Sequence, residues 1–487
     1  MKQKSIMKNS IFYMGYNILN MLFPFITSLY VARVLLPTTV GEVNYANNIV
    51  QYFVIMAFLG IPTYGLREIA KARDSKTELN KLFSELFTIN GISTIVFTLA
   101  YYGTVLIVPA FRNNFALYAI VGLHVVMNAF SITWLYEGLE EFGFISARNL
   151  IFKTVALIML FVFVKSDDDM LIYACISVIG TVGNNIVNMI HARKFVKYTP
   201  KGMDLKRHMK PIFMLVVVNL AIEIYTLVDT TMLGAMTTKD HVAFYTYASR
   251  INKIILQITN SITMVLVPRI SYYYGEKQYD DFNALLTKGL KTLIMMAVPM
   301  IIGIQFTARY LIVLLYGEAY ISSVYVEKIL CFVLLISPIG YLLGSRVMLV
   351  SGHEDKMIIC VGTGAIVNII GNFFLIRLWG EMGAAVASVI SELAVMIIYV
   401  NYGRKVFKLQ NWHGTVVKIL LAGGAEAAVL LLCKLLIPNE TARTIAQIIS
   451  GALAFVIVMY LEKDEVFNGY VKYFTGKLLR RKTDAQA

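Results

Sequence analysis

Seven basic side chains lie inside or beside long apolar stretches of this sequence, where a charge is costly: Arg33, Lys153, Arg250, Lys253, Lys291, Arg346 and Lys418. A charged residue at the centre of a membrane costs about 2.5–3.5 kcal/mol on insertion scales. Arg250 and Lys253 share one helical face with two amides of the same segment, Gln257 and Asn260. Such a face needs water, counter-charges or an anionic ligand, and guanidinium and ammonium groups suit phosphate.

Further polar stripes run along other apolar segments. We expect a cavity lined by Asn17, Asn20, Asn47 and Gln51 from the first two segments, by Gln257 and Asn260, and by Arg250, Lys253 and Arg346. The alternative for any single amide is that it only holds two membrane helices together.

Three acids in apolar segments, Glu223, Asp229 and Glu392, are candidates for ion pairing or for coupling to H⁺ or Na⁺. At 1.5 Å per helical residue, Glu223 and Arg250 reach similar depths in a bilayer core. We therefore expect Glu223 to pair with Arg250 or Lys253 in the empty cavity. Asp229 binds a coupling cation or only pairs near the interface, and both readings stay open.

The composition requires a membrane around these residues. Of the 487 residues, 58% are hydrophobic and only 15% are charged, with mean hydropathy +0.67, whereas soluble domains carry about 25% charged residues. The sequence predicts an all-α integral membrane protein. Its apolar segments long enough to span a bilayer number about fourteen: 10–34, 40–62, 83–109, 115–136, 143–164, 170–191, 211–234, 242–267, 286–307, 328–350, 357–378, 383–402, 415–436 and 444–461. Trp134, Trp379 and Trp412 fall at segment ends, where interfacial aromatics are expected.

The basic residues of the loops predict the orientation. Of 44 Lys and Arg, the predicted external loops hold eight: Arg112, Lys165, Lys239, Arg309, Lys328, Arg377, Lys434 and Arg443. Twenty-nine lie in the predicted internal segments, so both termini should be cytoplasmic, in a bacterial inner membrane. This bias also accounts for most of the net charge of +14 without nucleic acid.

Metal and enzyme chemistry have no support in the sequence. The six histidines form no HExxH pattern and the four cysteines no CxxC. No external loop is long enough to carry a catalytic constellation. We expect neither a metal site nor an enzyme activity.

A weak internal repeat suggests two halves. Residues 40–49 (VGEVNYANNI) align with residues 242–251 (VAFYTYASRI). An even number of spans separates the copies, which predicts two parallel six-helix lobes with a substrate path between them. The predicted organisation is 1–200 for the first lobe, 201–408 for the second, and 409–487 for two added helices and a basic tail.

Several motifs resemble a known family. Residues 28–37 (SLYVARVLLP), 41–46 (GEVNYA) and 60–71 (GIPTYGLREIAK) are similar to the N-terminal signature of Wzx-type polysaccharide repeat-unit flippases. Residues 228–234, 267–271 and 381–388 agree more loosely, and Leu36 departs from the glycine usual before that proline. These flippases belong to the multidrug/oligosaccharidyl-lipid/polysaccharide exporter superfamily, so the resemblance implies a MATE-like fold.

The resemblance also implies a function. Such proteins carry undecaprenyl-diphosphate-linked oligosaccharides to the outer leaflet by alternating access, for capsule or O-antigen. The resemblance also implies membrane lipids and polysaccharide polymerase machinery as partners. No cofactor is expected, apart from possible H⁺ or Na⁺ coupling. The alternatives are a peptidoglycan lipid-precursor flippase and a multidrug or cation antiporter. An antiporter for cations would favour a negatively charged cavity, whereas basic residues dominate the expected one.

Overall fold

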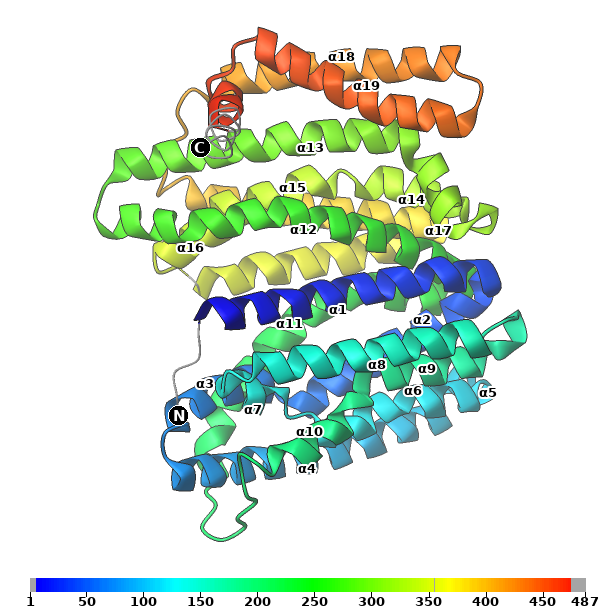
Figure 1. The fold of residues 1–487 in the computed structure, drawn as a ribbon, viewed down its shortest axis with the longest axis vertical. Helices are drawn as coiled ribbons and strands as arrows, with labels where there is room; N and C mark the ends of the chain where they lie inside the picture. The colour runs from blue at the N-terminus through cyan, green and yellow to red at the C-terminus, as the bar shows by residue number, and fades with distance from the viewer. Residues whose placement is uncertain (1–5, 354, 474–487) are drawn as a thin grey trace, which may run out of the picture. The chain divides into compact units, whose positions relative to one another are not determined.

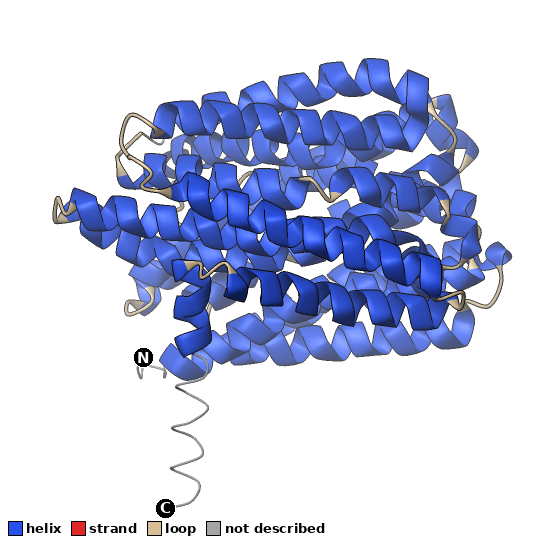
Figure 2. Cartoon of the chain, turned by 90° about the horizontal axis from the view of Figure 1, so that it is seen from above, coloured by secondary structure: helices blue, strands red, loops and turns tan. Residues whose placement is uncertain are grey.

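The structure is a computed structural model that describes residues 6–353 and 355–473. Every regular element in these two ranges is helical, and no strand occurs in them (Figures 1 and 2). This confirms the predicted all-α class. The chain divides into two compact units, Met1–Thr246 and Tyr247–Ala487. The predicted lobe boundaries at 200/201 and 408/409 rest on the sequence repeat and stay predictions.

The first unit begins with long helices and ends within α12. Its elements are α1 (Ile6–Val34), α2 (Pro37–Phe58), α3 (Ile61–Ala72), α4 (Lys76–Ile107), α5 (Pro109–Asn113), α6 (Phe115–Met127), η1 (Asn128–Phe130), α7 (Thr133–Gly138), α8 (Phe142–Phe163), η2 (Asp167–Asp169), α9 (Met170–Val182), α10 (Asn184–Ala192) and α11 (Lys206–Met236).

The second unit contains most of α12 and all later helices. Its elements are α12 (Lys239–Gly275), α13 (Tyr279–Tyr316), η3 (Glu318–Tyr320), α14 (Ser322–Leu330), α15 (Val333–Gly340), the π-helical η4 (Tyr341–Arg346), α16 (Val347–Val350), α17 (Asp355–Gly403), α18 (Trp412–Leu436) and α19 (Glu440–Leu461).

Twelve helical segments of the described residues are long and apolar enough to span a membrane. One of them, Lys356–Gly403, has 48 residues, or about 72 Å at 1.5 Å per residue, more than twice a bilayer core. Gly380 interrupts it with φ 54° and ψ −128°, between the predicted segments 357–378 and 383–402. The predicted number of about fourteen is not confirmed, because the 31-residue helix α11 is not among the twelve segments.

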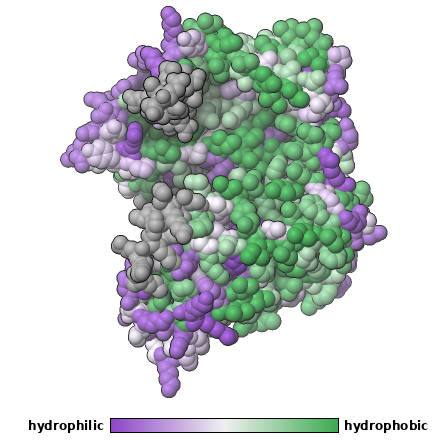
Figure 3. All heavy atoms as spheres, in the orientation of Figure 1, coloured by the Kyte–Doolittle hydropathy of each residue, from purple (hydrophilic) through white to green (hydrophobic). Residues whose placement is uncertain are grey.

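Apolar side chains cover the flanks of the helices as well as the cores. Leu99, Ile107 and Val265 are exposed although they are large and hydrophobic. In the face shown in Figure 3, green apolar spheres cover the middle of the helices, while purple polar spheres gather at the helix ends. Such a surface suits lipid and not water. Together with the candidate spans, it makes this a multi-pass membrane protein.

Three spans of the first unit are broken in their interior. The breaks lie at Leu59 and Gly60 between α2 and α3, at η1 and the two residues after it between α6 and α7, and at Gly183 between α9 and α10. In a membrane, broken helices are tolerated only where side chains or water satisfy the freed backbone groups. These breaks position the candidate site.

Candidate functional site: a cavity rich in hydrogen-bond donors

A cavity of about 480 Å³ lies within the first unit. Residues from α1, α2, α3, α6, η1, α7, α8, α9 and α10 line it, and all lining residues fall between Tyr16 and Asn185. The lining residues of α8 come from its first half, whereas those of α7 and α10 come from the second halves of the spans Phe115–Gly138 and Asp167–Ala192. Successive spans run in opposite directions, so the cavity lies toward the end of the unit that carries the basic 193–210 connection.

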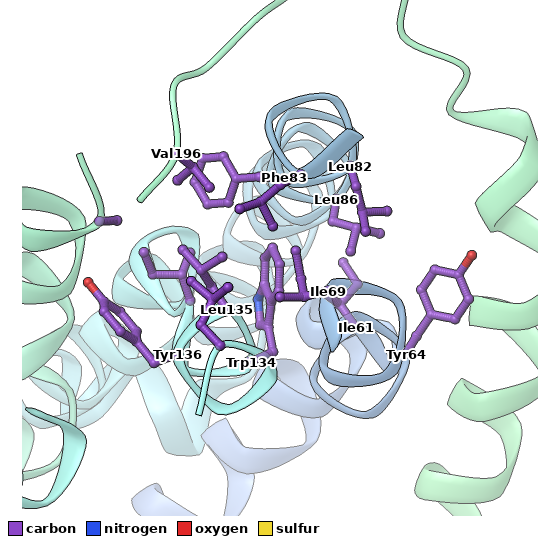
Figure 4. Close-up of a cluster of buried hydrophobic side chains, with 14 of the residues drawn as sticks. Ile61, Tyr64, Ile69, Leu82, Phe83, Leu86, Trp134, Leu135, Tyr136 and Val196 are labelled. Atoms are coloured by element: carbon purple, nitrogen blue, oxygen red, sulfur yellow. The ribbon is translucent and has the colours of Figure 1, made fainter. Parts of the chain in front are cut away.

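Two glycines allow the walls of this cavity to form. Gly60 has φ +72°, and a Cβ there would lie 2.8 Å from Leu215 Cβ. Gly65 on α3 lets the indole of Trp134 approach, because a Cβ would lie 2.8 Å from that ring. Figure 4 shows Trp134 between Ile61 and Ile69 of α3 and Phe83 and Leu86 of α4. The tight packing of α3 on α7 therefore fixes one wall.

Amides satisfy the broken span between α6 and α7. Asn90 Nδ2 donates to the carbonyl of Asn128 (2.9 Å), and Asn128 Nδ2 donates to Thr94 Oγ1 (2.9 Å). Asn185 Nδ2 donates to the carbonyl of Met127 (3.2 Å). Each bond fills a backbone or side-chain acceptor that the helix itself leaves open. Asn128 and Asn185 also line the cavity, so the residues that stabilise the break also form its wall.

Arg148 is the most informative residue of the cavity. It lies on α8, is only 5% exposed, and its Nε and Nη1 have no hydrogen-bond partner. The guanidinium carbon lies 5.9 Å from the centroid of the Phe144 ring. Trp134 is 2% exposed, and its indole N–H also lacks a partner. Unfilled donors of this kind are costly unless a ligand or water accepts from them.

Lys153 supplies a second positive charge one and a half turns further along α8. It is 8% exposed, and its Nζ donates to Asn20 Oδ1 at 2.6 Å and to the carbonyl of Leu19 at 3.3 Å. The same Asn20 oxygen accepts from Asn149 Nδ2 at 2.9 Å. The ammonium lies 5.1 Å from the centroid of the Phe23 ring. Asn20 therefore holds Lys153 in place without cancelling its charge.

Most of the remaining polar residues of the lining are neutral. Glu137 on α7 is the one carboxylate of the lining, which also contains the two basic residues Arg148 and Lys153. Glu137 makes no ion pair with a described residue. Gln51, Asn184 and other amides add groups that both donate and accept. The cavity can bind an anionic group through buried cations and hydroxyl-rich groups through amides and an indole.

The structure brings two of the predicted site residues of the first unit together. Asn20 and Gln51 both line the cavity. Asn17 is exposed and Asn47 is half-buried, and neither is a lining residue. Glu223 accepts from Thr226 Oγ1 (3.1 Å), and Asp229 accepts from the hydroxyl of Tyr245.

The other predicted residues belong to the second unit. The Arg250 guanidinium lies 5.3 Å from the Tyr247 ring centroid, and that of Arg346 lies 4.6 Å from the Tyr341 ring centroid. Lys253 and Gln257 are exposed, whereas Asn260 and Glu392 are half-buried. The expected pairing of Glu223 with Arg250 or Lys253 would connect a residue of the first unit with a residue of the second. It stays a prediction, as do the predicted roles of all these residues.

Sequence reasoning missed Arg148 and misplaced Trp134. Arg148 is the sixth residue of the predicted segment 143–164. It was therefore counted with the basic residues at the cytoplasmic end of that segment and not as a cavity residue. Trp134 fits an interfacial aromatic at a segment end, but the break before α7 turns it into the core. Lys153 was recognisable, because a lysine near the middle of an apolar segment is unusual.

Comparison with known proteins identifies the family. The model of the polysaccharide biosynthesis protein family matches residues 6–274, more than half of the chain, and the MatE model matches residues 215–374. The chain belongs to the polysaccharide biosynthesis protein family. A relative from Escherichia coli K12, named as an O-antigen transporter, is 23% identical over 79% of this chain and 93% of its own length. A Haloferax volcanii protein named as a low-salt glycan biosynthesis flippase is 20% identical over 37% of this chain and 38% of its own length.

Solved structures show the same fold for this polysaccharide biosynthesis protein. A lipid II flippase, MurJ, in an inward closed conformation has a TM-score of 0.73 at 16% identity, covering 93% of this chain and 98% of the other. An inward-facing multidrug resistance MATE transporter of the MOP superfamily has a TM-score of 0.63 at 14% identity, covering 81% and 97%. The predicted MATE-like fold is thus confirmed.

Proposed function

We propose that this protein is a flippase for a lipid-linked glycan, which it moves between the leaflets of a bacterial cytoplasmic membrane. The ligand is an undecaprenyl-diphosphate-linked oligosaccharide for a capsule or O-antigen type of polymer, and transport proceeds by alternating access. The names of the two relatives support the glycan and the flippase activity. No chemical step on the glycan is part of this proposal.

The observation that carries the proposal is the set of unfilled donors in the cavity. Arg148 Nε and Nη1 and Trp134 Nε1 are buried without an acceptor, beside the ammonium of Lys153. A diphosphate offers many acceptor oxygens with charge, and guanidinium binds them in a bidentate manner. The amides around these cations suit the hydroxyl groups of the first sugars.

The position of the cavity supports loading from the cytoplasm. It lies toward the end of the first unit where the basic connections 67–81 and 193–210 occur. Lys and Arg collect on the cytoplasmic side of membrane proteins. We therefore propose that both termini lie in the cytoplasm, and that the end of the first unit nearest the cavity faces the cytoplasm. Lipid-linked precursors are assembled on that side.

Deletion in the native host tests the transport activity. We expect a lipid-linked oligosaccharide to accumulate on the cytoplasmic leaflet and the surface polymer to disappear. Chemical analysis of the accumulated lipid identifies the glycan and separates a polymer repeat unit from a peptidoglycan precursor. An unchanged surface polymer with no accumulated lipid would contradict the proposal.

A binding experiment tests the site itself. The chain has three tryptophans, and replacing Trp379 and Trp412 by Phe leaves Trp134 as the remaining one. A short polyprenyl diphosphate should then change the emission of Trp134, whereas the matched polyprenol should not. The same change after Arg148→Ala, or no change at all, would exclude this cavity as the diphosphate site.

A further inference from the structure

A buried acid in the second unit lacks any partner. Glu327 on α14 is 2% exposed, and neither of its carboxylate oxygens has a hydrogen-bond or ion-pair partner. An ionised carboxylate in such a place is far more costly than a neutral carboxyl group. It is the sixth residue of the span Ser322–Val350, about 7.5 Å along the helix axis from the first residue.

The span that carries Glu327 is broken directly after it. α14 ends at Leu330, a turn follows, and α15 begins at Val333 before the π-helical segment η4 (Figure 1). π-helical segments occur often at functional sites. Broken helices form ion and substrate sites in transporters, because their ends expose polar backbone groups.

The hydrogen-bond donors near this break are already used. Gln305 Nε2 donates to the carbonyl of Lys328 (2.7 Å), and so does the thiol of Cys331 (3.1 Å). Asn252 Nδ2 donates to the carbonyl of Leu330 (2.5 Å). Asn252 Oδ1, which is also buried, has no donor. The break thus holds three acceptor oxygens, two on Glu327 and one on Asn252, without a donor for any of them.

No charged group nearby compensates Glu327. α12, α13 and α17 contact α14. The charged or titratable groups on these elements and on α14 itself, toward this end of the unit, include Lys328, Cys331, Tyr247, Arg250, Lys253, Arg309, Tyr316, Arg377 and Glu381. None of them bonds to either carboxylate oxygen of Glu327.

We propose that Glu327 is a proton-binding site, which takes up one proton while it is buried as described here and releases it when the break in this span opens to water. The step adds H⁺ to one carboxylate oxygen, and no other bond forms or breaks. A proton fits better than a metal ion, because hard cations take about six oxygen ligands and three are present. The coupling of this proton to transport rests on the proposed flippase function, whereas the binding of the proton does not.

The first test measures the protonated carboxyl group directly. Infrared spectra of the purified full-length protein in lipid vesicles at neutral pH should show the C=O stretch of a protonated acid, part of which disappears in Glu327→Gln. The matched control is Glu426→Gln on α18, since Glu426 is also buried and its Oε2 is without a partner. Loss of the band in Glu426→Gln alone would overturn the assignment to Glu327.

The second test measures coupling in vesicles that contain a lipid-linked oligosaccharide and a pH-sensitive dye. We expect proton flux during translocation by the wild type and by Glu426→Gln, and its loss in Glu327→Gln, which mimics the neutral acid. Translocation driven by a Na⁺ gradient and insensitive to pH, or equal proton flux in Glu327→Gln, would overturn the proposal. If the wild type moves no lipid while the infrared band responds to Glu327→Gln, the flippase function fails and the proton site stands.

Discussion

Buried polar atoms without partners are of two chemical kinds in this protein. In the cavity of the first unit most of them are donors, on Arg148 and Trp134, beside one acceptor, Asn128 Oδ1. At the break after α14 they are acceptors, on Glu327 and Asn252. Unfilled donors indicate a ligand with negative charge or lone pairs, whereas unfilled acceptors indicate a proton or cation. The two sites thus differ in what they can bind.

Arg148→Ala should weaken binding of a polyprenyl diphosphate. A hydrogen bond to a charged group contributes about 1.5–3 kcal/mol, so the dissociation constant should rise roughly 10- to 150-fold. The dissociation constant of Arg148→Lys should lie between those of the wild type and Arg148→Ala, because lysine keeps the charge but lacks the paired N–H groups. The matched control is Arg67→Ala, an exposed arginine of α3 that pairs with Glu68. Titration in detergent checks this, and equal affinities for wild type and Arg148→Ala would contradict it.

Substitutions of Asn20 should separate support of Lys153 from simple packing. Asn20→Ala removes the acceptor that holds the ammonium and should weaken diphosphate binding about threefold to tenfold, from roughly 1 kcal/mol per hydrogen bond. Asn20→Asp makes a stronger bond to Lys153 but neutralises it, so its binding should be weaker still. If Asn20 had only a structural role, the order would be reversed, and Asn20→Asp would bind the diphosphate more tightly than Asn20→Ala. Affinity measured beside thermal stability decides between them.

The sequence predicted part of this site. Asn20 and Gln51 were expected in a cavity because amides in apolar segments repeat on one helical face. Lys153 was noted as a charge within an apolar segment, but it was not among the expected cavity residues. Arg148 and Trp134 were missed, since the burial of Trp134 depends on how α7 packs against α3 and α4, and that of Arg148 on the cavity that several helices enclose. Spacing along one segment contains no information about that contact.

At the scale of the helices, the apolar segments were predictable and their interruptions were not. Hydropathy located the twelve described spans and the boundary at Gly380, although several helices extend six to ten residues beyond the predicted ends, as in Tyr279–Tyr316. The breaks at Gly60, η1 and Gly183 depend on side chains from other helices, such as Asn90, which donates to the carbonyl of Asn128. A hydropathy window averages over such positions and reports one continuous helix.

Gly60→Ala should destabilise the first unit. Its φ of +72° disfavours a side chain, and the new Cβ would lie 2.8 Å from Leu215 Cβ. Strain and overlap together should cost about 1–3 kcal/mol. The matched control is Gly103→Ala on α4, where no atom lies within 4 Å of a Cβ. Thermal unfolding in detergent should give a lower Tm for the first variant and an equal or higher Tm for the second. A Tm equal to that of the wild type in Gly60→Ala would contradict this.

At the scale of the whole molecule, the net charge of +14 indicates the orientation of the chain in the membrane rather than the charge of its ligand. Most basic residues lie in the connections at one side of the predicted membrane. The ligand site itself contains only two buried cations, Arg148 and Lys153. Net charge is therefore a poor guide to the binding chemistry of a membrane protein, although it predicts topology.

Reporter fusions test the orientation. Green fluorescent protein at the C-terminus should fluoresce, because that end is predicted to be cytoplasmic. Alkaline phosphatase fused after Pro438, in the connection between α18 and α19, should be active, since it requires export. A phosphatase fusion at Arg404, after α17, serves as the control and should be inactive. The reversed pattern would refute the predicted topology.

Every residue that lines the cavity falls between Tyr16 and Asn185. The groups of this cavity that would recognise a headgroup are thus encoded by one contiguous part of the gene. Recombination within the 3′ part would leave that set intact, whereas exchange of the 5′ part would transfer it whole to another member of the family. Ligand preference and energy coupling could then diverge separately in evolution, because the residues assigned to each lie in different parts of the gene.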